Sequence, residues 1–168
     1  TGPYGICGSL LPMTGTGNKI LTPSVANYQT VFNNSIRRPE TVGCLSTGTC
    51  PSGNSEPLLS ATTAMNKYNT DNNGFFRTNS DLAIVILSDA DERQTGGATY
   101  ANRPTELVSA FNSIWPSGKK LKVYSIIVQP NDATCLATMK AGSNGFSFYG
   151  TLVDQTVNLT NGISTSIC

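Results

Sequence analysis

The hydrophobic positions of the chain include two short, mostly apolar runs, LAIVIL at 82–87 and VYSIIV at 123–128. Runs of this length, bounded by polar and turn-forming residues, are typical of strands buried on both faces of a parallel sheet. We therefore predict a strand at each run, with a layer of structure on either side of it.

Other stretches carry apolar residues at helical spacing, so that one face of each stretch is apolar. In 104–115, for example, Leu107, Phe111 and Trp115 lie on one such face. The helix at 104–115 joins the two strands, and a strand–helix–strand unit implies parallel pairing with a right-handed crossover. The predicted helices cover 25–36, 58–68, 104–115, 133–142 and 151–159.

Three local signals add detail to this outline. Ser55 is a favourable N-cap for the helix at 58–68, with Glu56-Pro57 opening its first turn. Asn161-Gly162 is expected to end the last helix. The segment FSFYG at 146–150 is expected to form an irregular or edge strand.

The composition of the chain is unusually poor in charge. Charged residues make up 12% of the 168 residues, about half the usual fraction, and Ser, Thr, Asn and Gly fill the gap. A surface solvated by hydroxyls and amides is typical of an extracellular or cell-surface protein, and a periplasmic location fits it as well. The length suits one domain with its own core.

The charge distribution and the apolar runs exclude two classes of partner. The net charge is +1, and the basic residues are scattered apart from Arg37-Arg38 and a group at Lys119, Lys120 and Lys122. Nucleic-acid binding needs a wider basic footprint, so no nucleic-acid partner is expected. No apolar run approaches the ~20 residues of a membrane helix, so we expect no membrane span in this chain.

The chain has five cysteines, at positions 7, 44, 50, 135 and 168, and no histidine. None of them forms a C-x-x-C motif, so a zinc site with the usual ligands is not expected. Disulfides are the better interpretation: Cys44 with Cys50 around a short polar loop, and Cys135 with Cys168 at the end of the chain. Cys7 is then the odd cysteine, and its partner is expected on another chain or on a segment outside this sequence.

Three carboxylates follow the first apolar run, in Ser88-Asp89-Ala90-Asp91-Glu92. Ligands of open α/β sheets bind outside the carboxyl ends of the strands, where Asp89 lies. A rigidly placed carboxylate there suits a hard divalent cation, with Asp91 and Glu92 in the same region. The alternative is that Asp89 caps the loop by accepting hydrogen bonds from backbone N–H groups.

The segment GFFRTNSDLAIVILSDADE at 74–92 resembles the central strand and acidic strand end of von Willebrand factor A domains, particularly those of secreted bacterial proteins. SGNSEPLLSATTAM at 52–65 resembles the loop and helix that precede this strand in the family. KVYSIIV at 122–128, Cys135 and the closing segment at 148–168 resemble the next strand, a cysteine-bearing loop and the end of the domain.

The resemblance implies an α/β fold, with a Rossmann-like, mostly parallel sheet flanked by helices in a single domain over 1–168. Residues 1–42 match it most weakly. The first strand of the family, which carries a D-x-S-x-S motif, and its last helix have no counterpart here. Both ends of the chain are therefore expected to be clipped, with the first strand lying upstream or belonging to another chain.

The resemblance also implies a metal-ion-dependent adhesion site that binds Mg²⁺, Mn²⁺ or Ca²⁺. Asp89 matches the aspartate that ends the family's fourth strand. Thr49, Ser52 and Ser55 are candidates for the hydroxyl ligand before the second helix, and Asp91 is a second carboxylate within reach. Because D-x-S-x-S is absent, the expected set (Asp89, Asp91, Ser55 and Thr49) is sparse, and Mg²⁺ or Ca²⁺ is expected to bind weakly if the site is retained.

The expected function is that of an extracellular binding or adhesion module. Its loops at 44–57 and 89–103 would present a rim, with or without a divalent cation, to a protein or glycan ligand. The alternative is a structural subunit of a filament, pilus or surface assembly, whose partners are neighbouring subunits and to which Cys7 links it. An enzyme is not expected, because the absence of histidine removes the usual Ser-His-Asp and Cys-His arrangements.

Overall fold

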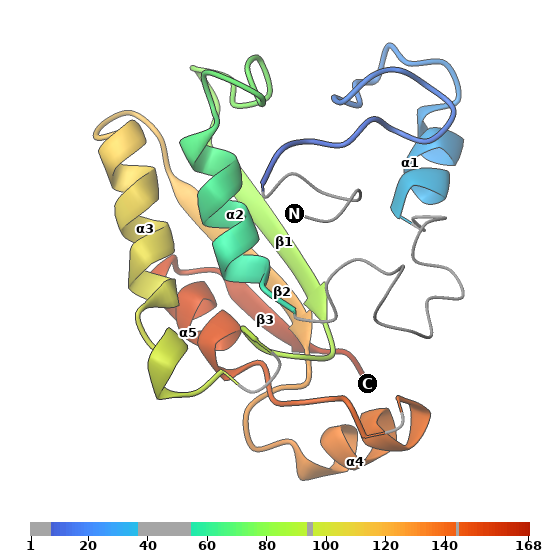
Figure 1. Ribbon diagram of the computed structural model, residues 1–168, viewed down its shortest axis with the longest axis vertical. Coiled ribbons are helices and arrows are strands. Elements are labelled where there is room, and N and C mark those ends of the chain that lie inside the picture. The colour runs from blue at the N-terminus through green and yellow to red at the C-terminus, as the bar shows by residue number, and fades with distance from the viewer. Residues whose placement is uncertain (1–7, 37–54, 94–95, 144) are drawn as a thin grey trace.

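The computed structural model describes residues 8–36, 55–93, 96–143 and 145–168. Helices and strands alternate through most of this range, as Figure 1 shows. The elements in chain order are α1 Tyr28–Ile36, α2 Pro57–Asn66, β1 Leu82–Ser88, the 3₁₀-helix η2 Ala98–Tyr100, α3 Arg103–Ile114, β2 Leu121–Ile127, α4 Ala133–Gly142, α5 Thr151–Leu159 and β3 Ile163–Ser166.

The three strands form one parallel sheet in the order β1-β2-β3. The register places Val85 opposite Tyr124, and Tyr124 opposite Ile163. β1, α3 and β2 confirm the predicted strand–helix–strand unit and its parallel pairing. The chain is therefore an α/β protein with a parallel sheet and flanking helices, an arrangement compatible with a Rossmann-like fold.

The third strand corrects the sequence-based outline. The segment at 146–150, expected as an irregular or edge strand, has no regular structure, and Ile163–Ser166 forms β3 instead. The expected end of the preceding helix is observed, because Asn161 has a φ of +50° there. A Cβ on Gly162 would lie 1.7 Å from the carbonyl oxygen of Val123, so only glycine lets β3 approach β2 so closely.

Helices α2, α3 and α5 lie together on one face of the sheet (Figure 1). The core forms between these helices and the sheet side chains that point toward them. Its buried members include at least one residue from each of the three helices and from β1 and β2. They are Leu58, Met65, Ile86, Leu107, Phe111, Val123, Ile127, Leu152, Val153 and Val157.

No described helix covers the opposite face of the sheet, and the side chains on this face are exposed, in contrast to the expectation that these strands are covered on both sides. Val85 and Leu87 of β1 are 67% and 68% exposed. Tyr124 and Ile126 of β2 and Ile163 of β3 are also exposed. An apolar run shows that both faces of a strand are suited to burial, but it does not reveal whether a second layer is present.

The N-terminal segment is attached to the end of α2 through buried Asn72. Its Nδ2 donates to the carbonyl oxygens of Gly8 and Ala64, and its Oδ1 accepts from the backbone N–H of Leu10. α1 begins at Tyr28, three residues after the predicted start at 25. This helix lies apart from the group formed by α2, α3 and α5 in Figure 1.

A disulfide joins Cys135 in α4 to Cys168 at the end of the chain, as predicted. Cys7, Cys44 and Cys50, with the predicted Cys44–Cys50 bond, lie outside the described residues. Among the helices that the structure describes, none is long and apolar enough to cross a membrane.

Candidate functional site

The turn after β1 places its three carboxylates in different surroundings. Asp91 and Glu92 are completely buried, whereas Asp89 is partly exposed. The backbone explains this separation, because β1 ends at Ser88 and the chain then turns beneath the N-termini of two helices.

Glu92 caps helix α2. Its Oε2 accepts a hydrogen bond of 2.9 Å from the N–H of Leu58, and its Oε1 accepts one of 3.0 Å from that of Leu59. Arg103 Nε lies 3.7 Å from Oε1 and balances the charge. The prediction that Ser55 is the N-cap is wrong: Glu56 holds that position without a side-chain cap, and Glu92 supplies the acceptor from across the fold.

Asp91 has the same role at helix α5. Its two oxygens accept from the N–H of Leu152, at 3.1 and 2.9 Å, and its Oδ1 also accepts from Val153 at 3.3 Å. Gly96 lies against the same carboxylate: a Cβ at this position would be 2.6 Å from Asp91 Oδ2, and Gly96 has a φ of +67°. Glycine is therefore required beside this carboxylate.

Burial raises the pKa of Asp91 and of Glu92 above the ordinary values, although the backbone N–H groups that they cap act in the opposite direction. For Glu92, Arg103 also lowers the pKa and nearby Glu56 raises it. Both carboxylates accept hydrogen bonds from N–H groups that have no partner within the helix, and both interact with the positive end of a helix dipole. Their oxygens are thus engaged in holding α2 and α5 to the end of β1.

Asp89 joins β1 to the loop that precedes α5. Its Oδ2 accepts a hydrogen bond of 3.2 Å from Ser147 Oγ, and its carbonyl oxygen accepts one of 2.8 Å from the N–H of Phe148. Ser147 is completely buried and also lies 2.8 Å from Ser143 Oγ. In the described residues, the side-chain partner of Asp89 is a hydroxyl, so the alternative that its carboxylate caps the loop through backbone N–H groups is not observed.

Ser55 lies beside the same strand end, as the predicted site requires. Its Oγ is 3.4 Å from Ser88 Oγ, and Ser88 Oγ donates to the carbonyl oxygen of Ala90 at 2.8 Å. The structure thus brings Ser55, Ser88 and Asp89 to one rim. Thr49, with Ser52, lies outside the described residues.

The rim offers few side chains that could coordinate a metal ion. Within the described ranges, no group of three or more His, Cys, Asp or Glu side chains is placed to hold a metal. Asp91 is already bound to the N-terminus of α5, so Asp89 with the hydroxyls of Ser55 and Ser88 forms the available set. These are hard oxygen donors, which suit a largely hydrated Mg²⁺ or Ca²⁺. The cation stays a prediction.

Sequence reasoning missed the residues that support the rim. Ser147 reaches Asp89 across 58 positions, and Arg103 contacts Glu92 from the start of α3. No local pattern marks either pair. The one signal in the sequence was the presence of three carboxylates in a chain with so few, which indicated a special role without distinguishing a ligand from a helix cap.

Comparisons of the chain with protein-family models, with curated proteins and with solved structures found no match in any of the three.

Proposed function

We propose that the chain is an extracellular binding or adhesion module of von Willebrand factor A type, which presents the rim of Ser55, Ser88 and Asp89 to a protein or glycan partner. This proposal rests on the difference in burial among the three carboxylates. Asp91 and Glu92 are buried as helix caps, whereas Asp89 remains partly exposed at the carboxyl end of a parallel strand. Ligands of open α/β sheets bind at that position.

The surroundings of Asp89 support a role in binding. Two serine hydroxyls lie at the same strand end, and buried Ser147 fixes the carboxylate in place. A rigid carboxylate beside hydroxyls can hold a hydrated divalent cation, which then accepts a carboxylate or hydroxyl from the partner. The low charge of the chain and the Cys135–Cys168 disulfide suit an oxidising, extracellular compartment.

The proposal is tested by thermal unfolding with and without millimolar Mg²⁺, Mn²⁺ or Ca²⁺. A cation that binds the folded chain raises the melting temperature by mass action. We expect a rise for the native chain and none for Asp89→Asn, which keeps the shape of the side chain and removes its charge. Asp81→Asn is the matched control, because Asp81 directly precedes β1 and therefore lies at the opposite end of this strand from the rim.

Two results would contradict the cation-dependent form of this function. One is a melting temperature that no cation changes. The other is an equal rise in the native chain and in Asp89→Asn, which would place the cation elsewhere.

A second candidate function, a structural subunit of an extracellular assembly, is favoured by the open face of the sheet. Parallel sheets are normally covered on both faces, and large exposed apolar patches mark interaction sites. Two cross-strand rows of this face contain no charged residue: Val85, Tyr124 and Ile163, and Leu87, Ile126 and Thr165. A further row, at the amino end of the strands, pairs Ala83 with Lys122, whose Nζ donates to the carbonyl oxygen of Asn161. Two copies of the chain can therefore join through these two uncharged rows without burying an unpaired charge.

Sedimentation velocity over a range of concentrations tests this second function. Self-association through the open face gives a weight-average mass that increases with concentration, and Leu87→Glu is expected to abolish the increase. Phe146→Glu is the matched control, because Phe146 is 65% exposed, against 68% for Leu87, and lies in a loop outside the sheet. A monomer at every concentration, or equal effects of the two variants, would contradict it.

A further inference from the structure

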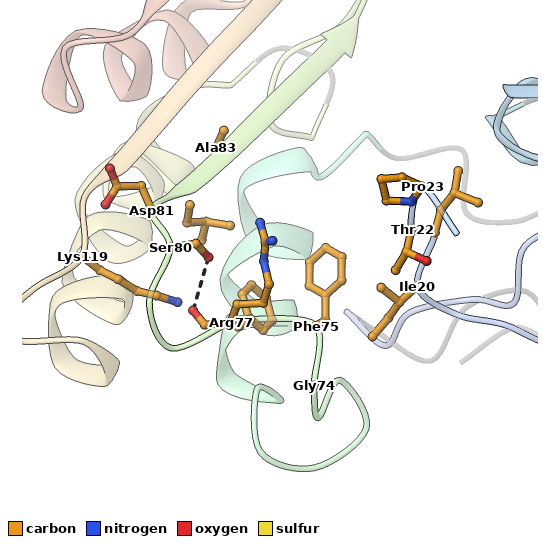
Figure 2. A pocket seen from close by; sticks show the side chains of 13 residues that line it. Ile20, Thr22, Pro23, Gly74, Phe75, Arg77, Ser80, Asp81, Ala83 and Lys119 are labelled. Carbon is orange, nitrogen blue, oxygen red and sulfur yellow. Dashed lines mark hydrogen bonds between the residues drawn. The ribbon is translucent and has the colours of Figure 1, made fainter. Parts of the chain in front are cut away.

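A cavity of about 600 Å³ lies at the amino end of β1, at the opposite end of this strand from the acidic turn. Figure 2 shows that the N-terminal segment at 20–23 forms one wall, and that the segment at 74–83 and Lys119 form the others. The cavity is therefore built from three separate parts of the chain, and none of its residues belongs to the rim described above.

Two cationic side chains, those of Arg77 and Lys119, line the cavity. Among the described residues, neither Arg77 nor Lys119 forms an ion pair. Burial lowers the pKa of Lys119, and the charge of Arg77 lowers it further. Asp81 opposes this effect, but its Oδ1 accepts from the backbone N–H of Lys120. The three charged groups that line the cavity thus leave one net positive charge, which an anion would balance.

The rest of the cavity is largely apolar. Phe75, 40% exposed, stands edge-on to Phe76 with ring centroids 5.0 Å apart, and Ile20 and Pro23 face it across the cavity (Figure 2). Such walls attract the apolar body of a ligand and not a bare inorganic ion. Arginine also matches the planar carboxylate through paired N–H donors.

We propose that this cavity binds an organic carboxylate, in which one negative charge is attached to an apolar or aromatic group. The carboxylate lies between Arg77 and Lys119, and the apolar group lies against Phe75, Ile20 and Pro23. A single charge suits the net positive charge of the cavity better than the two charges of sulfate or phosphate, because Asp81 would repel the second. The ligand is either the C-terminus of a peptide with an apolar last residue or a small organic acid.

Trp115 provides a direct readout of binding. It is the only tryptophan in the chain, and Lys119 Nζ lies 4.3 Å from the centroid of its ring. A carboxylate that pairs with Lys119 changes the field at this ring and therefore its fluorescence. The titration uses the full chain without divalent cations, so its result is independent of the proposed rim function.

The probes are N-acetyl-Leu-Phe with a free C-terminus, the same peptide as its amide, phenylacetate, and inorganic sulfate. We expect saturable fluorescence changes with the free peptide or phenylacetate and none with the amide or sulfate. The tighter of the two carboxylates identifies the source of the ligand. Arg77→Gln and Lys119→Gln are each expected to weaken binding by about tenfold or more.

Lys120→Gln is the control, because Lys120 is the neighbouring lysine and does not line this cavity. It is expected to bind like the native chain. Arg77 is exposed, so its replacement should leave the fold intact, and circular dichroism checks this. No saturable change with either carboxylate, an equal response to the amide or to sulfate, or unchanged affinity in a folded Arg77→Gln variant would each overturn the proposal.

Discussion

The two faces of the sheet are built by the same strands but differ in what lies over them. On the covered face, Val123 and Ile127 are completely buried beneath helices. On the open face, Val85 and Leu87 are about two-thirds exposed, at 67% and 68%. The hydrophobicity of these side chains does not account for this difference, because Val85 and Leu87 are as apolar as Val123 and Ile127.

The alternating side chains of strand β2 illustrate the difference between the two faces. Its covered face includes Ser125, which is buried and bonds Ser164 Oγ at 2.9 Å, whereas Tyr124 and Ile126 point to the open face. What distinguishes the covered face is its anchored helices, since Asp91 and Glu92 hold α5 and α2 to the end of β1. In the part of the chain that the structure describes, no such anchor holds a helix over the open face, and this is the reason for proposing that another copy of the chain covers it.

The largest expected effect compares Ile86 and Leu87, adjacent residues of β1 that point to opposite faces. Ile86→Ala should lower the free energy of unfolding by about 2–5 kcal/mol, because it leaves a cavity in the core. Leu87→Ala should cost less than about 0.5 kcal/mol at low protein concentration, where its side chain meets solvent. Urea unfolding followed by circular dichroism measures both.

Equal losses for the two variants would contradict the difference between the two faces, since Leu87 would then be covered in the monomer as well. A loss for Leu87→Ala that appears only at high protein concentration would instead show that a second copy covers this face.

A second effect concerns the anchor of the covered face. Glu92→Ala removes the acceptor for the N–H groups of Leu58 and Leu59 and leaves Arg103 without its buried partner. We expect a loss of about 1–3 kcal/mol, as for other buried donors left unpaired. Urea unfolding measures it, with Glu106→Ala as the control, because Glu106 is an exposed carboxylate on α3 that also contacts Arg103. Equal losses for the two variants would show that Glu92 does not anchor α2.

The smallest expected effect is a pH dependence of stability. Because the pKa values of Asp91 and Glu92 are raised in the folded state, the folded chain binds more protons than the unfolded chain just above the ordinary carboxyl pKa values. These two groups should therefore make stability increase as the pH falls through their folded-state pKa values toward the ordinary carboxyl values. Glu92→Gln should weaken this trend, as measured by urea unfolding at a series of pH values.

Asp71 gives a contribution of opposite sign in a different range. Hydrogen bonds from Ser9 and Lys67 lower its pKa below 3.8, so the stability that it contributes is lost only as the pH falls below that value. A pH trend that is unchanged in Glu92→Gln would contradict the assignment to the buried carboxylates.

Several features could be predicted because they depend on local sequence. The apolar run at 82–87 identified β1, and the helical spacing in 104–115 identified α3, which begins at Arg103. Because a helix joins the two apolar strands, parallel pairing followed from the strand–helix–strand connection. The Cys135–Cys168 bond could be inferred from the count and positions of the cysteines.

The short strand β3 could not be predicted, because ISTS is only four residues long and mostly polar. Its place in the sheet depends on Gly162, which lets the chain approach Val123. The segment at 146–150 has more aromatic residues, yet it serves as a loop, and its Phe148 N–H donates to the carbonyl oxygen of Asp89. Local preference was overridden here by the position of α5.

The sequence by itself determined that a carboxylate would stand at the end of an apolar strand, and that strands and helices would alternate in an α/β fold. Only the tertiary structure decided what each carboxylate does. The partners of Glu92 and Asp91 lie 34 and 61 positions away, so a helix cap of this kind leaves no periodic trace in the sequence. The open face could not be predicted for the same reason. Apolar residues indicate that burial is favourable, but contacts between distant elements determine whether a covering layer is present.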